Sequence, residues 1–167
     1  MYNMKECSSK QEKLIADALG WEVVKGSGSR PTRTGDVVGD RWLGECKTHM
    51  GGNHPVNITY DVWQKIKKEA IAKFKFPVLF VDDGSQQLSQ TWCILPNIAP
   101  ITSEYREQIE DYPFPIKKNL RFWTDALATW GFDRPNDPVS PIRLCKAEWN
   151  GETCYVVSFA AFQEMFG

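Results

Sequence analysis

Two segments of strand character, with a segment of helical character between them, constrain the fold of this chain most strongly. Residues 41–48 read as a strand, and residues 76–83 contain the continuous apolar run FPVLFV, which is typical of a buried strand. Residues 59–75 join the two strands and have helical periodicity. The apolar side chains that define this periodicity are Val62, Ile66, Ala70 and Phe74. The order strand, helix, strand predicts a protein of the α/β class.

A short helix is predicted near the start of the chain, over residues 9–19. Ser9 and Glu12 have the spacing of a capping box, and Gly20 is suited to end the helix. Ile15 lies on the same side of this helix as Glu12, so we expect the Glu12 carboxylate to point toward the core. The capping box is a competing explanation for Glu12, because the same carboxylate would then serve the helix terminus.

Three strands are expected between the two helices, at residues 21–25, 35–38 and 41–48, with a two-residue turn at Gly39–Asp40. The predicted order is therefore helix, three-stranded antiparallel meander, helix and strand. We expect these elements to form a compact α/β core over residues 8–95.

The remaining residues, 96–167, are expected to form an α+β extension of this core within a single domain of residues 1–167. Residues 102–131 read as mainly helical. A β-hairpin is predicted around Asn150–Gly151, which suits a type I′ turn. The segment FAAFQEMF should close the chain as a short amphipathic helix.

The composition is that of a globular protein, with 167 residues of which 42% are hydrophobic. No apolar run approaches the roughly 20 residues of a membrane span, and we expect no membrane partner. The five cysteines are odd in number and show no Cys-x-x-Cys spacing. These features favour an intracellular protein with reduced cysteines, and we expect a cytoplasmic location, which includes a nucleoid-associated or phage-encoded protein.

Charge is distributed unevenly although the net charge is only −1. Residues 1–80 contain 13 Lys and Arg against 9 Asp and Glu, whereas residues 81–167 contain 7 against 12. A basic first half is compatible with a phosphate-rich partner, and it is equally compatible with an ordinary solvated surface.

The segment GDVVGDRWLGECKTH carries the strongest functional signal. With a turn at Gly39–Asp40, Asp36 would pair with Leu43, and Glu45 would be its diagonal neighbour at about 7–8 Å. Lys47 and His49 follow Glu45 at a period of two, so their side chains project from the same face. Two carboxylates at this distance repel each other unless a cation lies between them.

A hard divalent cation such as Mg²⁺ is the usual partner of converging carboxylates. With a phosphodiester bound, the metal would polarise a phosphoryl oxygen, and Lys47 would stabilise the developing negative charge. The alternative is a surface hairpin whose alternating charges serve solubility. His49 is a secondary candidate for this site, and a zinc site is not supported, because Cys46 points to the opposite face.

The loop KGSGSRPTR combines basic and hydroxyl side chains with flexible backbone, which suits contact with phosphates. It is not a Walker loop, because no Gly-Lys-Ser/Thr follows. An ordinary surface loop remains the alternative. The candidate nucleic-acid-binding residues in this loop are Lys25, Ser27, Ser29, Arg30 and Arg33.

The lysines of the 59–75 helix could follow a nucleic-acid backbone, although a solvated helix face explains them nearly as well. Gln64 and Lys68 are four residues apart and share a face, so we take both as nucleic-acid-binding candidates. The seven tryptophans of the chain are expected in the core rather than as base-stacking platforms.

In its order of motifs the chain resembles the PD-(D/E)XK nuclease superfamily, and within it the archaeal-type Holliday junction resolvases. The resemblance covers residues 8–82 and rests on Glu12, on the segment GWEVVKGSGSRPTRTGD, and on LGECK. It implies a restriction-endonuclease-like core, with Glu12, Asp36 and Glu45 at the metal site and Lys47 as the catalytic lysine. Gly35 stands where the superfamily motif has proline.

By this resemblance we expect a metal-dependent endonuclease that hydrolyses phosphodiester bonds in DNA, with branched or Holliday-junction DNA as substrate and a role in recombination and repair. The cofactor would be Mg²⁺, with Mn²⁺ as the alternative, and no small-molecule cofactor is expected. Symmetric cutting of a four-way junction requires two sites related by a twofold axis, so a homodimer is expected. The alternatives are a restriction-type or single-strand-acting nuclease on the same core, or an inactive nucleic-acid-binding module.

Overall fold

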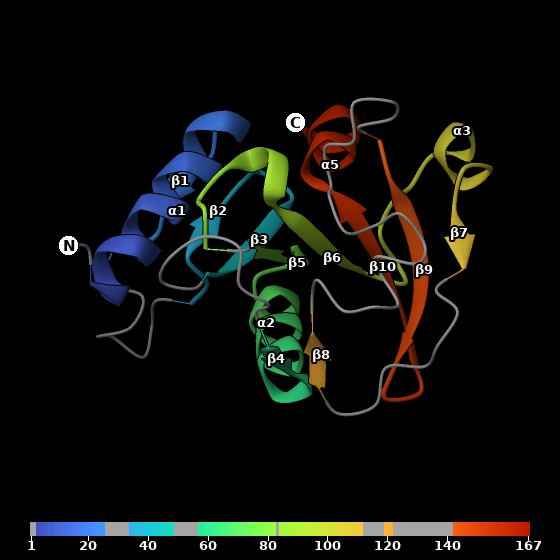
Figure 1. The fold of residues 1–167 in the computed structure, drawn as a ribbon. Helices are drawn as coiled ribbons and strands as arrows, with labels where there is room; N and C mark the ends of the chain where they lie inside the picture. The colour runs from blue at the N-terminus through green and yellow to red at the C-terminus, as the bar shows by residue number, and fades with distance from the viewer. Residues whose placement is uncertain (1–2, 26–33, 49–56, 83, 112–118, 122–141) are drawn as a thin grey trace.

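The computed structural model describes residues 3–25, 34–48, 57–82, 84–111, 119–121 and 142–167. It is a mixed α/β structure built on an eight-stranded sheet with the strand order β1-β2-β3-β5-β6-β10-β9-β7 (Figure 1). The strands of this sheet are β1 (Glu22–Val23), β2 (Val37–Val38), β3 (Trp42–Lys47), β5 (Phe76–Val81), β6 (Trp92–Pro96), β7 (Glu110–Asp111), β9 (Leu144–Trp149) and β10 (Glu152–Ser158). A separate two-stranded sheet pairs β4 (Asn57–Thr59) with β8 (Asn119–Arg121).

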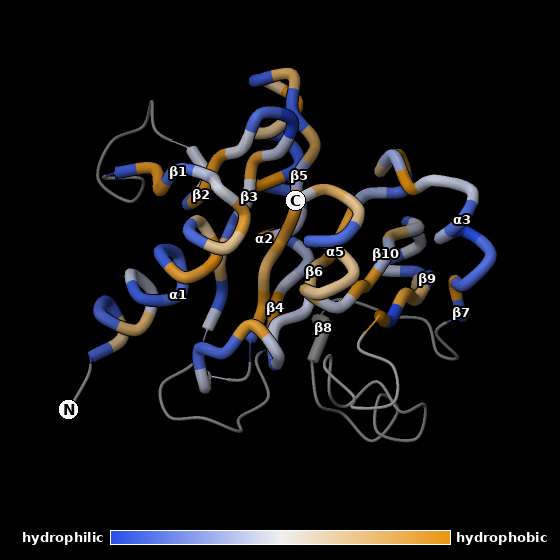
Figure 2. The backbone as a smooth tube through the Cα atoms, turned by 90° about the horizontal axis from the view of Figure 1, so that it is seen from above, coloured by the Kyte–Doolittle hydropathy of each residue, from blue (hydrophilic) through white to orange (hydrophobic). Residues whose placement is uncertain are grey.

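Helices cover both faces of the large sheet. The helices are α1 (Met4–Leu19), α2 (Tyr60–Ala72), α3 (Ser103–Arg106) and α5 (Phe159–Phe166), with a 3₁₀ turn η1 at Leu88–Gln90. Buried residues of α1 and α5 share one hydrophobic cluster with one face of the sheet, whereas those of α2 share a second cluster with the other face. The sheet is therefore the middle layer of three. Figure 2 shows the central strand β5 as a hydrophobic segment between these layers.

The predicted order of the first elements is confirmed. Strands β1, β2 and β3 form an antiparallel meander, and β5 then pairs with β3 in parallel after α2. A parallel neighbour requires a crossover connection, which is the role of α2 here. Strand β4, which the sequence did not predict, lies between β3 and α2 in the chain.

The N-terminal helix begins earlier than predicted. Asn3 is its N-cap residue, and it forms a capping box with Glu6 in which each side chain accepts a hydrogen bond from the other residue's backbone N–H. Ser9 therefore lies inside the helix, and the capping role predicted for Glu12 is wrong. Gly20 ends the helix as predicted, in the left-handed conformation with φ +69°.

The turn between β2 and β3 lies one residue further along the chain than predicted. Val37 pairs with Gly44 and Val38 pairs with Leu43, which moves the two-residue turn to Asp40–Arg41. Gly39 instead makes room for the ring of Trp21, because a Cβ atom at this position would lie 2.5 Å from that ring. The predicted pairing of Asp36 with Leu43 is therefore wrong.

Helix α2 also ends differently from the prediction. Trp63, Ile66 and Ala70 are buried as part of its apolar face. Phe74, which the apolar periodicity placed on the same face, lies beyond the end of the helix and is 98% exposed.

The C-terminal elements partly follow the predictions. The hairpin of β9 and β10 is confirmed, with Asn150 and Gly151 both at positive φ in the turn. The predicted final helix is α5. The prediction that residues 102–131 are mainly helical is wrong for the part that the structure describes, where only α3 is helical and β7 and β8 are strands. Strand β10 pairs with β6, so the predicted core and extension share one sheet.

All five cysteines are free and buried. Among the described residues, no helix is both long enough and apolar enough to cross a membrane. Of the seven tryptophans, Trp63, Trp92 and Trp149 are fully buried, which confirms a core role for these three.

Candidate functional site

Strands β2 and β3 bring Asp36, Glu45 and Lys47 together. The backbone N–H of Asp36 donates to the carbonyl oxygen of Gly44 (2.8 Å), and the backbone N–H of Cys46 donates to Asp36 Oδ2 (2.9 Å). These two bonds hold the Asp36 carboxylate beside β3, level with Glu45. The register differs from the predicted one by an even number of residues, so the predicted facing of the side chains is kept.

Lys47 is paired with Glu45 within the same strand. The Nζ atom of Lys47 lies 3.2 Å from Glu45 Oε1, and the Glu45 side chain is largely buried while that of Lys47 is one-third exposed. The two side chains point in the same direction because they are two residues apart along a strand. The lysine ammonium thus lies at the solvent side of the Glu45 carboxylate.

Glu12 approaches the same carboxylates from α1. Its side chain is partly buried, and Asp36, Glu45 and Lys47 are the charged groups that act on it. Burial, together with the negative charges of Asp36 and Glu45, raises the pKa of Glu12 to about 7, and Lys47 opposes this rise. Glu12 is therefore the third carboxylate of one electrostatic cluster.

Burial also raises the pKa of Glu45. The negative charge of Asp36 adds to this rise, while the cations Lys47 and Lys65 oppose it. The neighbouring thiol of Cys46 is fully buried, and its pKa is raised well above the ordinary value, first by burial and then by Asp36. Cys46 is thus held as a neutral thiol and is no nucleophile at neutral pH.

Three carboxylates with a single adjacent ammonium form a site that favours an additional positive charge. The oxygen donor set suits a hard cation such as Mg²⁺ or Mn²⁺. In the part of the chain that the structure describes, however, no group of three or more His, Cys, Asp or Glu side chains is arranged so that it could hold a metal ion. The donors fit the chemistry of the ion, and Lys47 occupies one oxygen of Glu45 in this structure.

Gln11, which the sequence did not single out, joins α1 to the site strand. Its Nε2 atom donates to the backbone carbonyl of Lys47 (2.7 Å), and the side chain is 1% exposed. The same carbonyl accepts from the backbone N–H of Asp82 (3.2 Å) at the end of β5. Gln11 directly precedes Glu12, so this bond fixes the position from which Glu12 reaches the cluster.

The side of α2 nearest the cluster carries Lys65 and Glu69 rather than the predicted pair. Glu69 Oε2 accepts a hydrogen bond from the backbone N–H of Gly35 (3.1 Å), and Lys65 Nζ lies 3.6 Å from Glu69 Oε1. Gly35 has φ +73°, a conformation closed to proline. Proline also lacks the backbone N–H that donates the hydrogen bond to Glu69. Glycine rather than proline at position 35 therefore has a structural reason.

The predicted pair Gln64 and Lys68 lies on a different side of α2. Gln64 donates from Nε2 to the Tyr60 hydroxyl, which donates to Glu152 Oε2 (2.6 Å). Gln64 and Lys68 line a groove of ≈ 490 Å³ between α2 and β6 whose lining includes none of the four predicted catalytic residues.

Of the predicted nucleic-acid-binding loop, the described residues include Lys25. Lys25 is exposed just after β1. The other candidates lie outside the described residues, namely Ser27, Ser29, Arg30, Arg33 and the secondary candidate His49.

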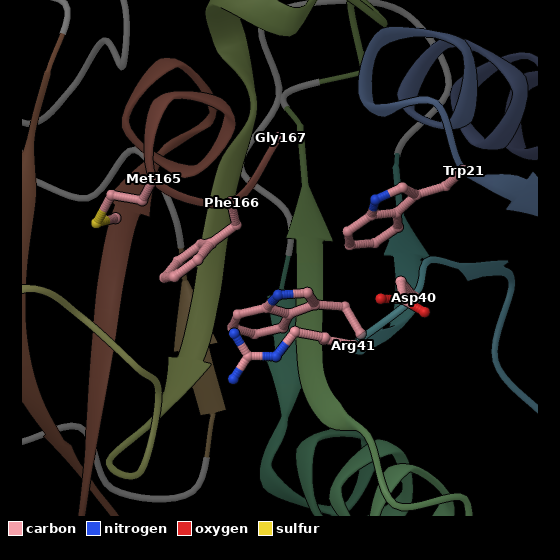
Figure 3. A pocket seen from close by; sticks show the side chains of 7 residues that line it. Trp21, Asp40, Arg41, Met165, Phe166 and Gly167 are labelled. Carbon is pink, nitrogen blue, oxygen red and sulfur yellow. The ribbon is translucent and has the colours of Figure 1, made fainter.

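A second pocket, of ≈ 290 Å³, lies away from the carboxylates (Figure 3). Figure 3 shows Trp21 and Arg41 on one side of it and Met165 and Phe166 on the other. The rings of Trp42 and Phe166 pack at 4.8 Å between centroids, and none of the predicted site residues lines this pocket. It is formed where the end of α5 packs beside the turn between β2 and β3.

Comparison of the chain with protein-family models, with curated proteins and with solved structures gave no match. The resemblance to the PD-(D/E)XK nucleases therefore rests on the residues and on their arrangement alone.

Proposed function

We propose that this protein is a metal-dependent endonuclease that hydrolyses phosphodiester bonds in DNA. The observation that carries the proposal is the cluster of Glu12, Asp36 and Glu45, which come from three separate segments of the chain and have one lysine, Lys47, paired with Glu45. Burying carboxylates beside one another costs free energy unless a cation compensates them. Such a cost is typical of functional sites.

The arrangement of the elements supports a restriction-endonuclease-like core. The chain order of α1, the β1–β2–β3 meander, α2 and β5 agrees with the order that the resemblance implies. The acidic cluster combines residues of the meander with Glu12 of α1, and Glu69 of α2 binds the Gly35 N–H beside it. Glu12, free of a capping role, is then available to the site.

Glu12, Asp36 and Glu45 would hold Mg²⁺ or Mn²⁺, which supplies Lewis-acid activation of a phosphoryl oxygen and of a water molecule. Lys47 Nζ is close enough to Glu45, at 3.2 Å, to stabilise negative charge that develops on a phosphate bound at the same place. The partly buried Asp36 carboxylate accepts from the Cys46 N–H at Oδ2, which orients it before the substrate binds.

The proposal is tested by cleavage assays with plasmid, duplex, single-stranded and four-way-junction DNA in the presence of Mg²⁺ or Mn²⁺. We expect wild-type protein to cut, and Glu45→Ala and Lys47→Ala to lose cleavage by about 10²-fold or more while remaining folded. If the wild-type protein cuts no DNA or RNA with either metal, the proposed activity is wrong.

For the substrate, we propose branched or Holliday-junction DNA cut by a homodimer, in agreement with the resemblance. Equal cutting of a four-way junction and of a duplex with the same sequence would contradict this choice and favour a restriction-type enzyme. Sedimentation or light scattering of the protein reports the oligomeric state.

The second candidate function is an inactive nucleic-acid-binding module. It is favoured by one observation, the lack of a ready-made group of metal ligands among the described side chains. Such a module would bind DNA without cleavage, and Glu45→Ala would leave its affinity unchanged or increase it, because a negative charge is removed.

A further inference from the structure

The end of α2 carries a phenylalanine where helices usually carry glycine. The backbone N–H of Lys75 donates to the Ala70 carbonyl (2.9 Å), and that of Phe74 donates to the Ile71 carbonyl (3.0 Å). This pair of hydrogen bonds defines a Schellman motif, in which Phe74 occupies the left-handed position with φ +56°. Glycine is strongly preferred there because it has no Cβ.

Phe74 is also the most exposed large hydrophobic residue among those that the structure describes, at 98%. The side chain thus combines backbone strain with full exposure of an aromatic ring to water. Neither feature benefits the fold, and strain of this kind is concentrated at functional positions.

Two further exposed hydrophobic residues lie beside this position. Ile71 is 66% exposed and Ile98 is 68% exposed, and both line the groove between α2 and β6. Met4, the first residue of α1, is the one remaining exposed large hydrophobic residue in the described ranges. Exposed apolar surface is therefore concentrated at the end of α2.

Two lysines adjoin this apolar surface: Lys68 lines the groove with Ile71 and Ile98, and Lys73 directly precedes Phe74 in the chain. Lys68 and Lys73 form no ion pair or hydrogen bond with any other described residue, whereas Lys67 is bound to Glu152. Lys75 donates from Nζ to the carbonyls of Gly39 and Asp40 at 2.9 and 2.7 Å. The segment is anchored by Lys75 to the turn between β2 and β3, so Phe74 is presented on a fixed backbone.

We propose that Phe74, Lys68 and Lys73 form a binding surface for unpaired nucleotides, in which a base stacks on the Phe74 ring and the adjacent phosphates contact the two lysines. The proposal rests on the proposed function, because it takes nucleic acid as the ligand. It places the binding of single-stranded segments at a surface outside the acidic cluster. An exposed aromatic ring beside free cations is the chemistry by which proteins hold single strands without sequence preference.

A second copy of this chain suits the surface less well. A twofold interface joins the same surface patch of both subunits, so the positively charged patch with Lys68 and Lys73 would lie against an equally positive patch of the partner. Like charges across an interface are repulsive. A single strand, in contrast, offers bases to the ring and phosphates to the lysines.

The test is a fluorescence-anisotropy titration in EDTA with a fluorescein-labelled 20-nucleotide oligothymidylate and with a duplex of equal length. We expect wild-type protein to bind the single strand, and Phe74→Gly to bind it about 5- to 150-fold more weakly, the range that corresponds to loss of one stacked base. Phe74→Trp should keep the affinity. Lys68→Ala and Lys73→Ala should weaken binding and reduce its salt dependence.

Glycine fits the backbone at position 74, so Phe74→Gly removes the ring without disturbing the fold. The matched lysine control is Lys146→Ala, because Lys146 is exposed on β9 and its neighbours on the strand, Cys145 and Ala147, face α2 while it does not. This control should bind like wild type. Unchanged affinity of Phe74→Gly, or no binding by the wild-type protein, would overturn the proposal.

The two proposals fail in different ways. If wild-type protein cuts DNA with Mg²⁺ and Phe74→Gly binds the single strand normally, the proposed single-strand surface is wrong, whereas the proposed nuclease activity is supported. If Phe74→Gly loses single-strand binding while no metal supports cleavage, the surface is supported and the proposed activity is wrong.

Discussion

The backbone N–H of Gly35 donates a hydrogen bond of 3.1 Å to Glu69 Oε2, so the entry into β2 is bound to α2. The bond is possible because Gly35 has φ +73°, and a Cβ atom there would lie 2.7 Å from Leu43 Cδ1. The residue directly before Asp36 is thereby fixed, and the position of the Asp36 carboxylate with it.

Substitution of Gly35 should therefore destabilise the protein more than substitution of another glycine with similar φ. We expect Gly35→Ala to lower the free energy of unfolding by about 2–3 kcal/mol, from left-handed strain and from the clash with Leu43. Gly20→Ala is the control, since Gly20 has φ +69° and no atom within 4 Å of its Cβ position. It should cost about 1 kcal/mol. Urea unfolding measures both, and equal costs would contradict the role of Leu43.

The pKa of Glu12 predicts a pH dependence of stability. Because the folded protein raises this pKa from 4.5 to about 7, the folded state binds the proton more tightly than the unfolded state between these values. The free energy of unfolding should fall as the pH rises through this window. Glu12→Gln removes this fall and should be more stable than wild type above pH 7 without metal. Thermal unfolding from pH 4.5 to 8 tests this, with the exposed Glu107→Gln as a control that should follow wild type.

Metal binding should follow the same titration. A cation that binds the carboxylates displaces the proton from Glu12, so the stabilisation by Mg²⁺ or Mn²⁺ should increase as the pH rises through about 7. We expect 10 mM Mg²⁺, taken as about 100 times Kd, to stabilise wild type by about 2.7 kcal/mol at pH 8 and by less at pH 6. Glu45→Ala should abolish the effect. An equal rise in melting temperature for both proteins would place the ion elsewhere.

Phe74→Gly should stabilise the fold. The native conformation at this position has φ +56°, which costs a residue with a side chain about 1 kcal/mol relative to glycine. The ring loses no packing on removal, since it is almost fully exposed. We expect the free energy of unfolding to rise by up to about 0.6 kcal/mol, after roughly 0.4–1 kcal/mol is subtracted for the greater freedom of glycine in the unfolded chain. A loss of stability would show that the ring contributes to the fold.

The facing of the site residues was predictable, whereas the turn was not. Alternation along residues 43–47 places Glu45 and Lys47 on one side of β3 whatever the length of the turn. Asp36 faces the same side as predicted because the register shift is even. The position of the turn depends on Gly39, whose lack of a side chain admits the ring of Trp21. A contact between two separate elements of this kind has no signature in the local sequence.

The start of α1 shows a second limit. Asn3 with Glu6 and Ser9 with Glu12 both have capping-box spacing, and the local pattern alone does not distinguish them.

Whether Gln64 or Lys65 lies nearer the carboxylates depends on how α2 is rotated about its own axis. That rotation is fixed by the packing of Trp63 against Trp149, which comes from the far end of the chain.

The pairing of β6 with β10 has a consequence for how the chain folds. Trp92 lies opposite Ser158 and Pro96 lies opposite Cys154, so the middle of the sheet is closed by segments about 60 residues apart in the chain. Contacts of such high sequence separation slow folding, because the loop must close before the strands gain anything from pairing. During synthesis, the segments that carry the acidic cluster emerge early, but β10, which pairs with β6, is the last strand to emerge. We expect the complete sheet, and with it the buried environment of the site, to form only after the final hairpin has docked.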